Sequence, residues 1–487
     1  MSDLEGYHVN KSERGKCIRV RKLFSLITVE PTMILYMMAF MTTSVVEQAL
    51  FVDKACRVNH NYTKEICDDI ANPKYKDINK EVQVTVSEFH QWNDIAGHVI
   101  PIILAFFVGA WSDKRGRKIP LLLGLIGKFY YSVMIVVNTL QPTWPVEYII
   151  YTATFPSTLT GADVAIFAAA FTYLFDVSSP TNRTLRVTIL EVCYLATMPT
   201  GIALGKYLFS NVTARSFTTM FIINASLLLA SLIYSMIFLK WRTSEMQRPL
   251  REANCILTDF FDYKHVVSTF QTLGKKRAMG RRTYLLLMIV AMGFYSFQRD
   301  EKGMSYLFFQ LEHKWSFDQN SNFRTFISAV QDVILLLAMP LMTKVFGWRD
   351  TFIMMIGAAC HSIARLFYAF ADVTWLIYIG GAFAACGPIV APVLRSITSK
   401  LVPVSERGKA FSMLSVTDNA ITLFSGIVYN QVYKLSIHTN PEAIFYVTIA
   451  TQMAVFLIAF YIHCHANDTQ LCHKDDYDTE ESNPFPT

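Results

Sequence analysis

The hydrophobic residues of this chain are grouped in long continuous stretches that are separated by polar segments, and they do not alternate with polar residues over a few positions. Twelve apolar stretches recur, each near the roughly 20 residues that an α-helix needs to cross a bilayer. The first six predicted spans are 29–51, 89–111, 119–140, 147–175, 187–209 and 217–239. The second six are 284–309, 323–345, 351–370, 373–399, 411–433 and 443–463. The pattern predicts an all-α membrane protein with twelve transmembrane helices.

The spans form two sets of six, separated by a long polar stretch. Weak internal repetition supports two pseudo-symmetric halves, a recurring feature of transporters. The composition agrees, because 52% hydrophobic and 17% charged residues are too apolar a mixture for an ordinary soluble chain. The predicted parts are a tail at 1–28, a half at 29–239 with an outer loop at 52–88, a linker at 240–282, a half at 283–463 and a tail at 464–487.

The net charge of +6 does not indicate nucleic-acid binding, because Lys and Arg gather in alternate loops. Basic residues such as Arg19 and Arg21 precede the first span, and Lys275, Lys276 and Arg277 lie in the linker. Cytoplasmic loops carry such an excess of basic residues. We therefore expect the linker and both termini to be cytoplasmic.

The predicted outer face carries a cysteine pair in the loop at 52–88 and two glycosylation sequons. Cys56 and Cys67 share this loop, and their spacing permits a disulfide without proving one. Asn61 and Asn211 each begin an Asn-x-Thr sequon on the predicted outer face. We expect both asparagines to be glycosylated.

A short charged hairpin joins the second and third spans. It runs from Gly109 to Lys118 and reads Gly-Ala-Trp-Ser-Asp-Lys-Arg-Gly-Arg-Lys. We expect Gly109 to let two helices approach closely and Gly116 to permit a sharp turn. Asp113 is placed to meet a neighbouring helix N-terminus and a basic partner. The alternative is a short positive loop whose glycines are accidental.

Acidic-then-basic turns follow the fourth and tenth spans at equivalent points of the two halves. Together with the hairpin, these turns resemble the loops of the major facilitator superfamily. The resemblance implies the major facilitator fold and transport by alternating access. It also implies a charge network that clamps the cytoplasmic helix ends, formed by Gly109, Asp113, Arg117, Asp176, Arg183 and Arg186.

Finer motifs resemble the proton-coupled folate transporter and its relatives, solute carrier family 46. The motifs are Val29-Glu30-Pro31, the 183–186 run leading to Glu191, and the segments 391–402 and 425–433. The resemblance implies a proton-coupled symporter of small organic anions, such as folate-like compounds, peptidoglycan fragments or conjugates. The folate transporter carries a functional histidine in its seventh span, and its absence here argues against folate itself.

Two acids within the predicted spans are candidates for proton coupling. Glu191 lies in an apolar helix, where a carboxyl group removed from water can carry a proton across and release it. The resemblance matches it to the family's proton-coupling glutamate, and the alternative is a helix-end carboxylate exposed to cytoplasm. Asp163 lies among small residues and would face a cavity or a cation. Asp94 and His98 stand one turn apart, and we interpret them as a self-satisfied pair.

Three charged residues of the second half are candidate substrate contacts. Arg395 lies in a span interrupted by glycines and prolines, and such helices expose side chains to a central cavity. Its guanidinium needs an anionic partner from the substrate or the protein, unless it snorkels to the interface. Arg299 and Glu301 belong to a run of four charges, which either lines the cavity or marks an early outer helix end. His361 and Arg365 are interpreted as a structural pair.

Nothing in the sequence indicates an enzyme, because no nucleophile–base set, phosphate loop or metal cage stands out. We expect no metal and no cofactor beyond a proton gradient, and we expect a small-molecule substrate and the lipid bilayer as partners. Asn483, Pro484 and Phe485 resemble a ligand of endocytic adaptor domains. We expect a monomer or loose dimer in the plasma or endolysosomal membrane. Two alternatives stay open, a drug-type exporter or antiporter of the same superfamily and a transport-dead receptor or scaffold.

Overall fold

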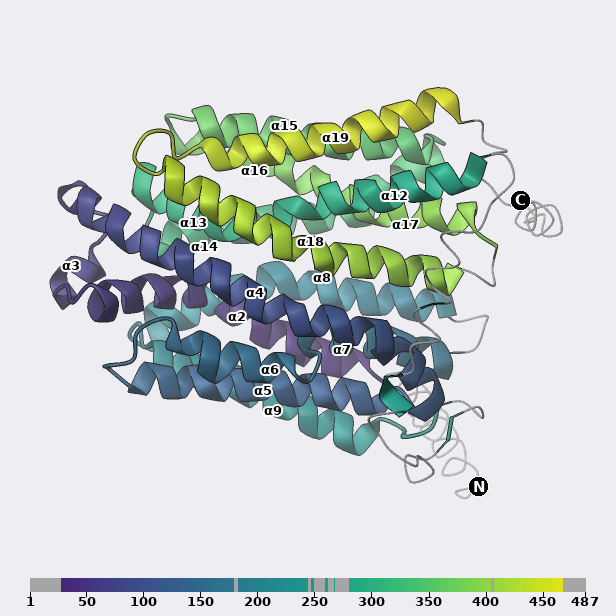
Figure 1. Ribbon diagram of the computed structural model, residues 1–487, viewed down its shortest axis with the longest axis horizontal. Coiled ribbons are helices and arrows are strands. Elements are labelled where there is room, and N and C mark those ends of the chain that lie inside the picture. The colour runs from purple at the N-terminus through teal and green to yellow at the C-terminus, as the bar shows by residue number, and fades with distance from the viewer. Residues whose placement is uncertain are drawn as a thin grey trace, which may run out of the picture.

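The computed structural model describes residues 28–178, 183–243, 247–248, 259–261, 267, 280–403 and 407–466. Every element in this part of the chain is helical, and the helices run roughly side by side in one bundle (Figure 1). The predicted all-α architecture is confirmed. Most of both predicted tails, together with the Asn-Pro-Phe tripeptide, lies outside the described residues.

The first half contains six spanning units, several of which consist of more than one helical segment. They are α2 (Glu30–Lys54), α4 (Lys76–Arg115), α5 (Lys118–Leu140), η3 (Ile150–Thr154) with α6 (Phe155–Thr158) and α7 (Ala162–Val177), α8 (Arg183–Tyr207) with η4 (Leu208–Val212), and α9 (Phe217–Phe238). Gly161 breaks the fourth unit between α6 and α7, where its φ of +82° suits glycine.

The second half repeats this plan. Its units are α12 (Arg281–Ser296) with η7 (Phe297–Arg299) and α13 (Glu301–Glu312), α14 (Phe317–Val333) with η8 (Ile334–Ala338) and η9 (Leu341–Val345), α15 (Asp350–Phe370), α16 (Thr374–Cys386) with η10 (Gly387–Ile389) and α17 (Val390–Leu401), α18 (Arg407–Ser436), and α19 (Ala443–His465). Because α13 continues to Glu312, the charges at 299–302 mark a break inside the seventh unit rather than its outer end.

Nine segments of the described chain are long and apolar enough to cross a membrane. They coincide with nine of the twelve predicted spans. The other three units are α8, the pair α12 and α13, and α18. These three units carry Glu191, the 299–302 charges and Asp418.

Each half is held together by close helix contacts. In the first half, α2 packs along α8 and α9, and in the second half α15 packs along α19 and α16. A Cβ atom at Gly205 of α8 would overlap the Thr42 carbonyl oxygen of α2, so only glycine fits this crossing. Across the boundary between the halves, α4 lies beside α18 (Figure 1), and α8 lies beside α14.

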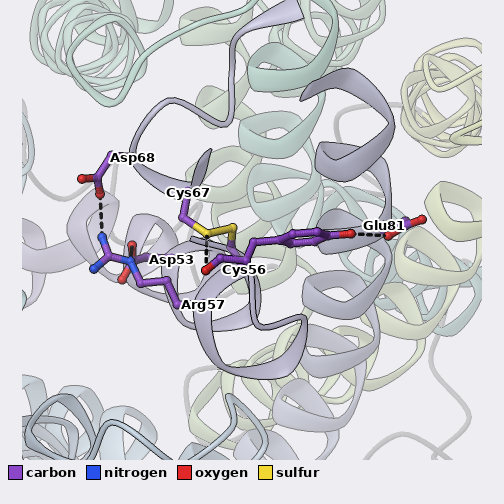
Figure 2. Close-up of a disulfide and its surroundings, with 7 residues drawn as sticks. Asp53, Cys56, Arg57, Cys67, Asp68 and Glu81 are labelled. Atoms are coloured by element: carbon purple, nitrogen blue, oxygen red, sulfur yellow. Dashed lines mark hydrogen bonds and ion pairs between the residues drawn. A yellow bond between two sulfur atoms is a disulfide. The ribbon is translucent and has the colours of Figure 1, made fainter. Parts of the chain in front are cut away.

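One end of the bundle carries the Cys56–Cys67 disulfide, which joins η1 (Ala55–Asn59) to α3 (Lys64–Asp68). Figure 2 shows the adjacent Arg57, which bonds to Asp53 at 2.7 Å and to Asp68 at 2.5 Å. We call this end the disulfide face, and the opposite end, where the described linker residues lie, the linker face.

The outer loop is shorter than predicted, because α2 ends at Lys54 and α4 begins at Lys76. The sequon residues Asn61 and Asn211 are both exposed near the disulfide face.

Candidate functional site

A cavity of about 170 Å³ lies within the first half, between α2, α4, α5, α7 and α9. Its wall combines acids, a lysine, a histidine and tyrosines with apolar side chains. The polar wall residues that matter for the chemistry are Tyr36, Glu47, Asp94, His98, Lys128, Tyr131 and Asp163. Ionisable groups inside membrane-spanning units are costly and by default indicate a functional site.

Asp163 lies in the first turn of α7, directly after the break at Gly161. Its carboxylate is 2.7 Å from the ammonium of Lys128 on α5, and Tyr36 of α2 donates a hydrogen bond to it. The sequence predicts that Asp163 faces either a cavity or a cation. In the structure it does both, because it lines the cavity and pairs with Lys128.

Glu47 and Lys128 were not among the residues singled out from the sequence. Tyr131 donates a hydrogen bond to Glu47, and the Lys128 ammonium lies 5.8 Å from the ring centroids of both Phe40 and Tyr131. Each residue is a single charge within an otherwise apolar run, and that signal was available in the sequence.

Glu191 and Arg395 lie on opposite halves, on α8 and α17, and both side chains are exposed. The guanidinium of Arg395 is near enough to attract the Glu191 carboxylate electrostatically. Two candidates chosen from distant parts of the sequence therefore act on each other electrostatically across the boundary between the halves.

Arg299 is 42% exposed and forms an ion pair with Asp418 of α18, which the sequence reading had not singled out. Ser296 also donates a hydrogen bond to Asp418, at 2.5 Å. Both Arg299 and Arg395 interact electrostatically with Tyr194 of α8. Both arginines of the second half therefore act on the same residue of the first half.

Glu301 lies in a different environment from Arg299. Its carboxylate is 3.0 Å from the Arg365 guanidinium, and the side chains are only 3% and 6% exposed. Arg365 in turn contacts His361 at 2.9 Å, as expected for a structural pair. Because the Glu301 carboxylate is already bound inside the second half, we do not carry it forward as a substrate contact.

The charge network at the linker face contains two ion pairs among the described residues. Arg117 bonds to Asp176 at 3.0 Å, and Arg186 bonds to Glu30 at 3.2 Å. The side chains of Asp113 and Arg183 lie outside the described residues.

The structure supports the prediction for one of the two hairpin glycines and not for the other. The φ of +110° at Gly116 confirms the predicted sharp turn. Gly109 makes no close approach to the described residues in this conformation, because a Cβ atom there would meet none of them within 4 Å.

The described linker residues bind the first half. Thr243 donates a hydrogen bond to Asp176 at 2.9 Å. Asp259 accepts bonds from Arg115 at 2.7 Å and from Lys114 at 2.6 Å. The hydrogen bond from Arg115 is the main reason that the pKa of Asp259 lies well below its usual range.

Polar contacts join the halves near the disulfide face. Gln83 of α4 bonds to the Leu307 carbonyl at 3.1 Å and accepts a hydrogen bond from Tyr433 at 2.6 Å. Ser87 donates to the Asn430 carbonyl at 3.1 Å. Toward the rim, ion pairs add to these bonds, namely Lys76–Glu312, Arg215–Asp318 and Lys434–Glu88. The conformation is closed at the disulfide face.

Comparison with known proteins agrees with this architecture. The family model described as Major Facilitator Superfamily matches residues 66–379. A Drosophila melanogaster protein named probable peptidoglycan muropeptide transporter SLC46 is 22% identical over 85% of this chain and 80% of its own length. The proton-coupled folate transporter of Bos taurus is 23% identical over 76% and 78%. The lysosomal proton-coupled steroid conjugate and bile acid symporter SLC46A3 of Gallus gallus is 25% identical over 85% and 88%.

Solved structures show the same fold. A D-xylose-proton symporter superposes with a TM-score of 0.65 at 14% identity, over 92% of this chain and 99% of the other. The human organic anion transporter MFSD10 gives 0.61 at 12% identity, over 90% and 99%. These findings confirm the resemblance to solute carrier family 46 and the predicted fold. The chain belongs to the major facilitator superfamily and is a multi-pass membrane transporter rather than an enzyme.

Proposed function

We propose that this transporter is a proton-coupled symporter of small organic anions. The observation that carries the proposal is the cavity inside the first half, whose wall holds Glu47 and the Asp163–Lys128 pair. Carboxylates that line a cavity within membrane-spanning helices typically mark proton paths in transporters. Relatives named proton-coupled folate transporter and proton-coupled steroid conjugate and bile acid symporter support the same reading.

Glu191 and Asp163 are the proposed proton-coupling residues. Glu191 has the electrostatic partner that such a role requires, because Arg395 attracts its ionised form. Protonation of Glu191 releases Arg395 from this attraction and leaves the guanidinium free for an anionic substrate. Loss of the proton restores the pair and expels the anion. Proton and substrate therefore move together.

Arg395 and Arg299 are the proposed anion contacts. Both arginines act electrostatically on Tyr194 and on Tyr295 of α12. We therefore assign the two guanidinium groups and the two phenol hydroxyls to one binding region. Guanidinium groups bind carboxylate, sulfate and phosphate oxygens through paired hydrogen bonds. We propose a cargo with at least one such group.

The linker face is the proposed cytoplasmic face, because basic residues gather in its hairpin at 114–118 and in the linker. The disulfide and both sequons then lie outside or in a lumen, which suits an oxidising compartment. On this orientation the closed disulfide face makes the conformation inward-facing. The resident membrane is the plasma membrane or an endolysosomal membrane.

The test is uptake into sealed vesicles that contain the purified protein. A panel of anionic compounds is offered with and without an inward proton gradient, and the pH of the vesicle interior is followed at the same time. We expect anion uptake to rise with the gradient and to acidify the interior. Glu191→Gln should abolish the gradient dependence, whereas Glu65→Gln, an exposed residue of α3, should keep it. Gradient-independent flux, export in exchange for protons, or no flux of any compound would each overturn the proposal.

A further inference from the structure

Three titratable side chains, His90, Asp94 and His98, stand one turn apart on α4. Residues four apart share one face of a helix, and this face meets the second half. The Cε1 atom of His90 lies 4.0 Å from the position of a Cβ atom at Gly303 of α13. The Oδ2 atom of Asp94 lies 2.9 Å from the equivalent position at Gly426 of α18. The stripe therefore follows the seam between the halves and ends at His98 in the cavity.

Asp94 is opposed by a second carboxylate from the other half. Asp300 lies between η7 and α13, and Ser425, the neighbour of Gly426, donates a hydrogen bond to it. The two acids therefore contact consecutive residues of α18, and their charges repel each other. Two carboxylates that repel each other inside a helix bundle cannot both ionise without cost, and closely spaced carboxylates can share one proton.

Positively charged groups also lie near the pair, and Arg299 and Lys302 both attract the ionised form of Asp300. Arg299 is bonded to Asp418, Glu301 to Arg365, and Lys128 to Asp163. The side chain of Lys302 is exposed, so water screens its charge. The charged groups from the elements around the pair are Glu47, Lys128, Asp163, Arg299, Glu301, Lys302 and Asp418.

His90 supplies an independent indication of a ligand at the seam. Its side chain is 7% exposed, and its Nε2 atom has no hydrogen-bond partner among the described residues. Buried polar atoms are nearly always bonded, so an unpartnered imidazole nitrogen facing α13 marks an interaction that the seam lacks. A proton fits the neighbouring pair of carboxylates, because one bound proton removes one of the two facing charges.

We propose that Asp94 and Asp300 form a shared proton site whose occupation locks the two halves together at the disulfide face. The inference rests on the proposed proton coupling and adds a second proton site to it. Without the proton, two negative charges from opposite halves drive the seam apart. One proton from the solution at the disulfide face, bound between the two carboxyl groups, removes the repulsion and lets Gln83 and Ser87 make their bonds. Its release past His98 into the cavity reopens the disulfide face.

Closure can be measured without transport, by the distance between two spin labels. Positions 91 and 431 suit the labels, because the two glutamine side chains bond across the seam at 2.6 Å. The full-length protein carries Gln91→Cys and Gln431→Cys, with serine in place of its free cysteines. No substrate is added. The closed fraction should rise as the pH falls from about 8 to about 5, since a one-proton equilibrium changes by up to about tenfold per pH unit.

Two variants and a control test whether Asp94 and Asp300 cause the pH-dependent closure. Asp94→Asn and Asp300→Asn each remove one of the repelling charges, so each should be as closed at high pH as the parent is at low pH. Asp69→Asn removes an exposed acid of the same face that bonds only to Asn72 among the described residues, and it should keep the parent's pH response. Unaltered pH responses in both seam variants would overturn the shared site. Closure driven by sodium or calcium at constant pH would also overturn it, in favour of a metal cation.

The vesicle assay separates this inference from the proposed function. If closure follows pH as described but no proton-coupled uptake is found, the shared site stands and the symport proposal fails. If both seam variants keep pH-dependent closure while uptake is proton-coupled, the shared site fails and the symport proposal stands.

Discussion

Glu301 and Arg365 form an ion pair that is almost completely enclosed by the second half, with 3.0 Å between Oε2 and Nε. Thr448 of α19 donates a hydrogen bond to the same carboxylate, and Tyr429 of α18 contacts Thr448 at 2.5 Å. Four helices, α13, α15, α18 and α19, are therefore joined through one carboxyl group. An enclosed charge pair with this many bonds is a structural connection between helices.

Removing one member of the pair should destabilise the protein. Glu301→Gln leaves Arg365 enclosed without a counter-charge, and such a change costs about 3–5 kcal/mol. Thermal unfolding of the purified protein in detergent measures the loss. The double variant Glu301→Met and Arg365→Met removes both charges and should recover most of the stability. A Glu301→Gln protein that unfolds like the parent yet has lost substrate affinity would show that Glu301 contacts the substrate after all.

Two glycines form a matched pair for packing. Gly205→Ala places a methyl group against the Thr42 carbonyl of α2, and such overpacking costs about 1–3 kcal/mol. Gly109→Ala meets none of the described residues within 4 Å, and the better helix propensity of alanine should add about 0.5–1 kcal/mol. Thermal unfolding of both variants should therefore show shifts of opposite sign. Equal shifts would mean that α2 and α8 separate easily at their crossing.

The apolar runs located the spans well, because the thickness of the bilayer sets their length. They missed the first three turns of α4, from Lys76 to residue 88. This segment contains Gln83 and Ser87, which are buried through hydrogen bonds to the second half. A hydropathy pattern assigns such polar residues to a loop, because it does not show that they form hydrogen bonds across an interface between helices.

Among the residues of the cavity wall, Asp163 was singled out from the sequence, because a charge among small apolar residues stands out. The roles of Glu191, Arg395 and Arg299 stay predictions. Glu47 and Lys128 were missed because a long apolar run hides one charge from a reading of average hydropathy. Partners in space depend on how helices pack, and no local pattern reveals that.

The Cys56–Cys67 disulfide should stabilise the disulfide face. Its cysteines are 11 residues apart, and closing a loop of this size in the unfolded chain is worth about 3 kcal/mol. Replacement of both cysteines by serine should lower the unfolding temperature, and a reducing agent should lower that of the parent to the same value. The double variant should not respond to the reducing agent. If the parent does not respond either, the bond contributes nothing to stability.

The contact between the linker and α4 should not respond to pH within the physiological range. Arg115 and Lys114 hold the pKa of Asp259 well below its usual range. A carboxyl group with a lowered pKa in the folded state stabilises that state above its unfolded pKa of about 3.9, and the contribution disappears only as the pH falls through the lower folded value. Between about pH 8 and pH 5 the group is ionised in both states, so its contribution stays constant.

Amide hydrogen exchange at 259–261, corrected for the intrinsic effect of pH on the exchange rate, measures this contact. Protection should be the same at both ends of that pH range in the parent. Asp259→Asn should lower it at every pH, because the neutral amide keeps the shape of the side chain but loses the charge that Arg115 binds. A pH dependence of uptake would then not come from this contact, which leaves Glu191, Asp163 and the seam between Asp94 and Asp300 as its proposed sources. Protection that falls on mild acidification of the parent would place a pH-sensitive element in the linker instead.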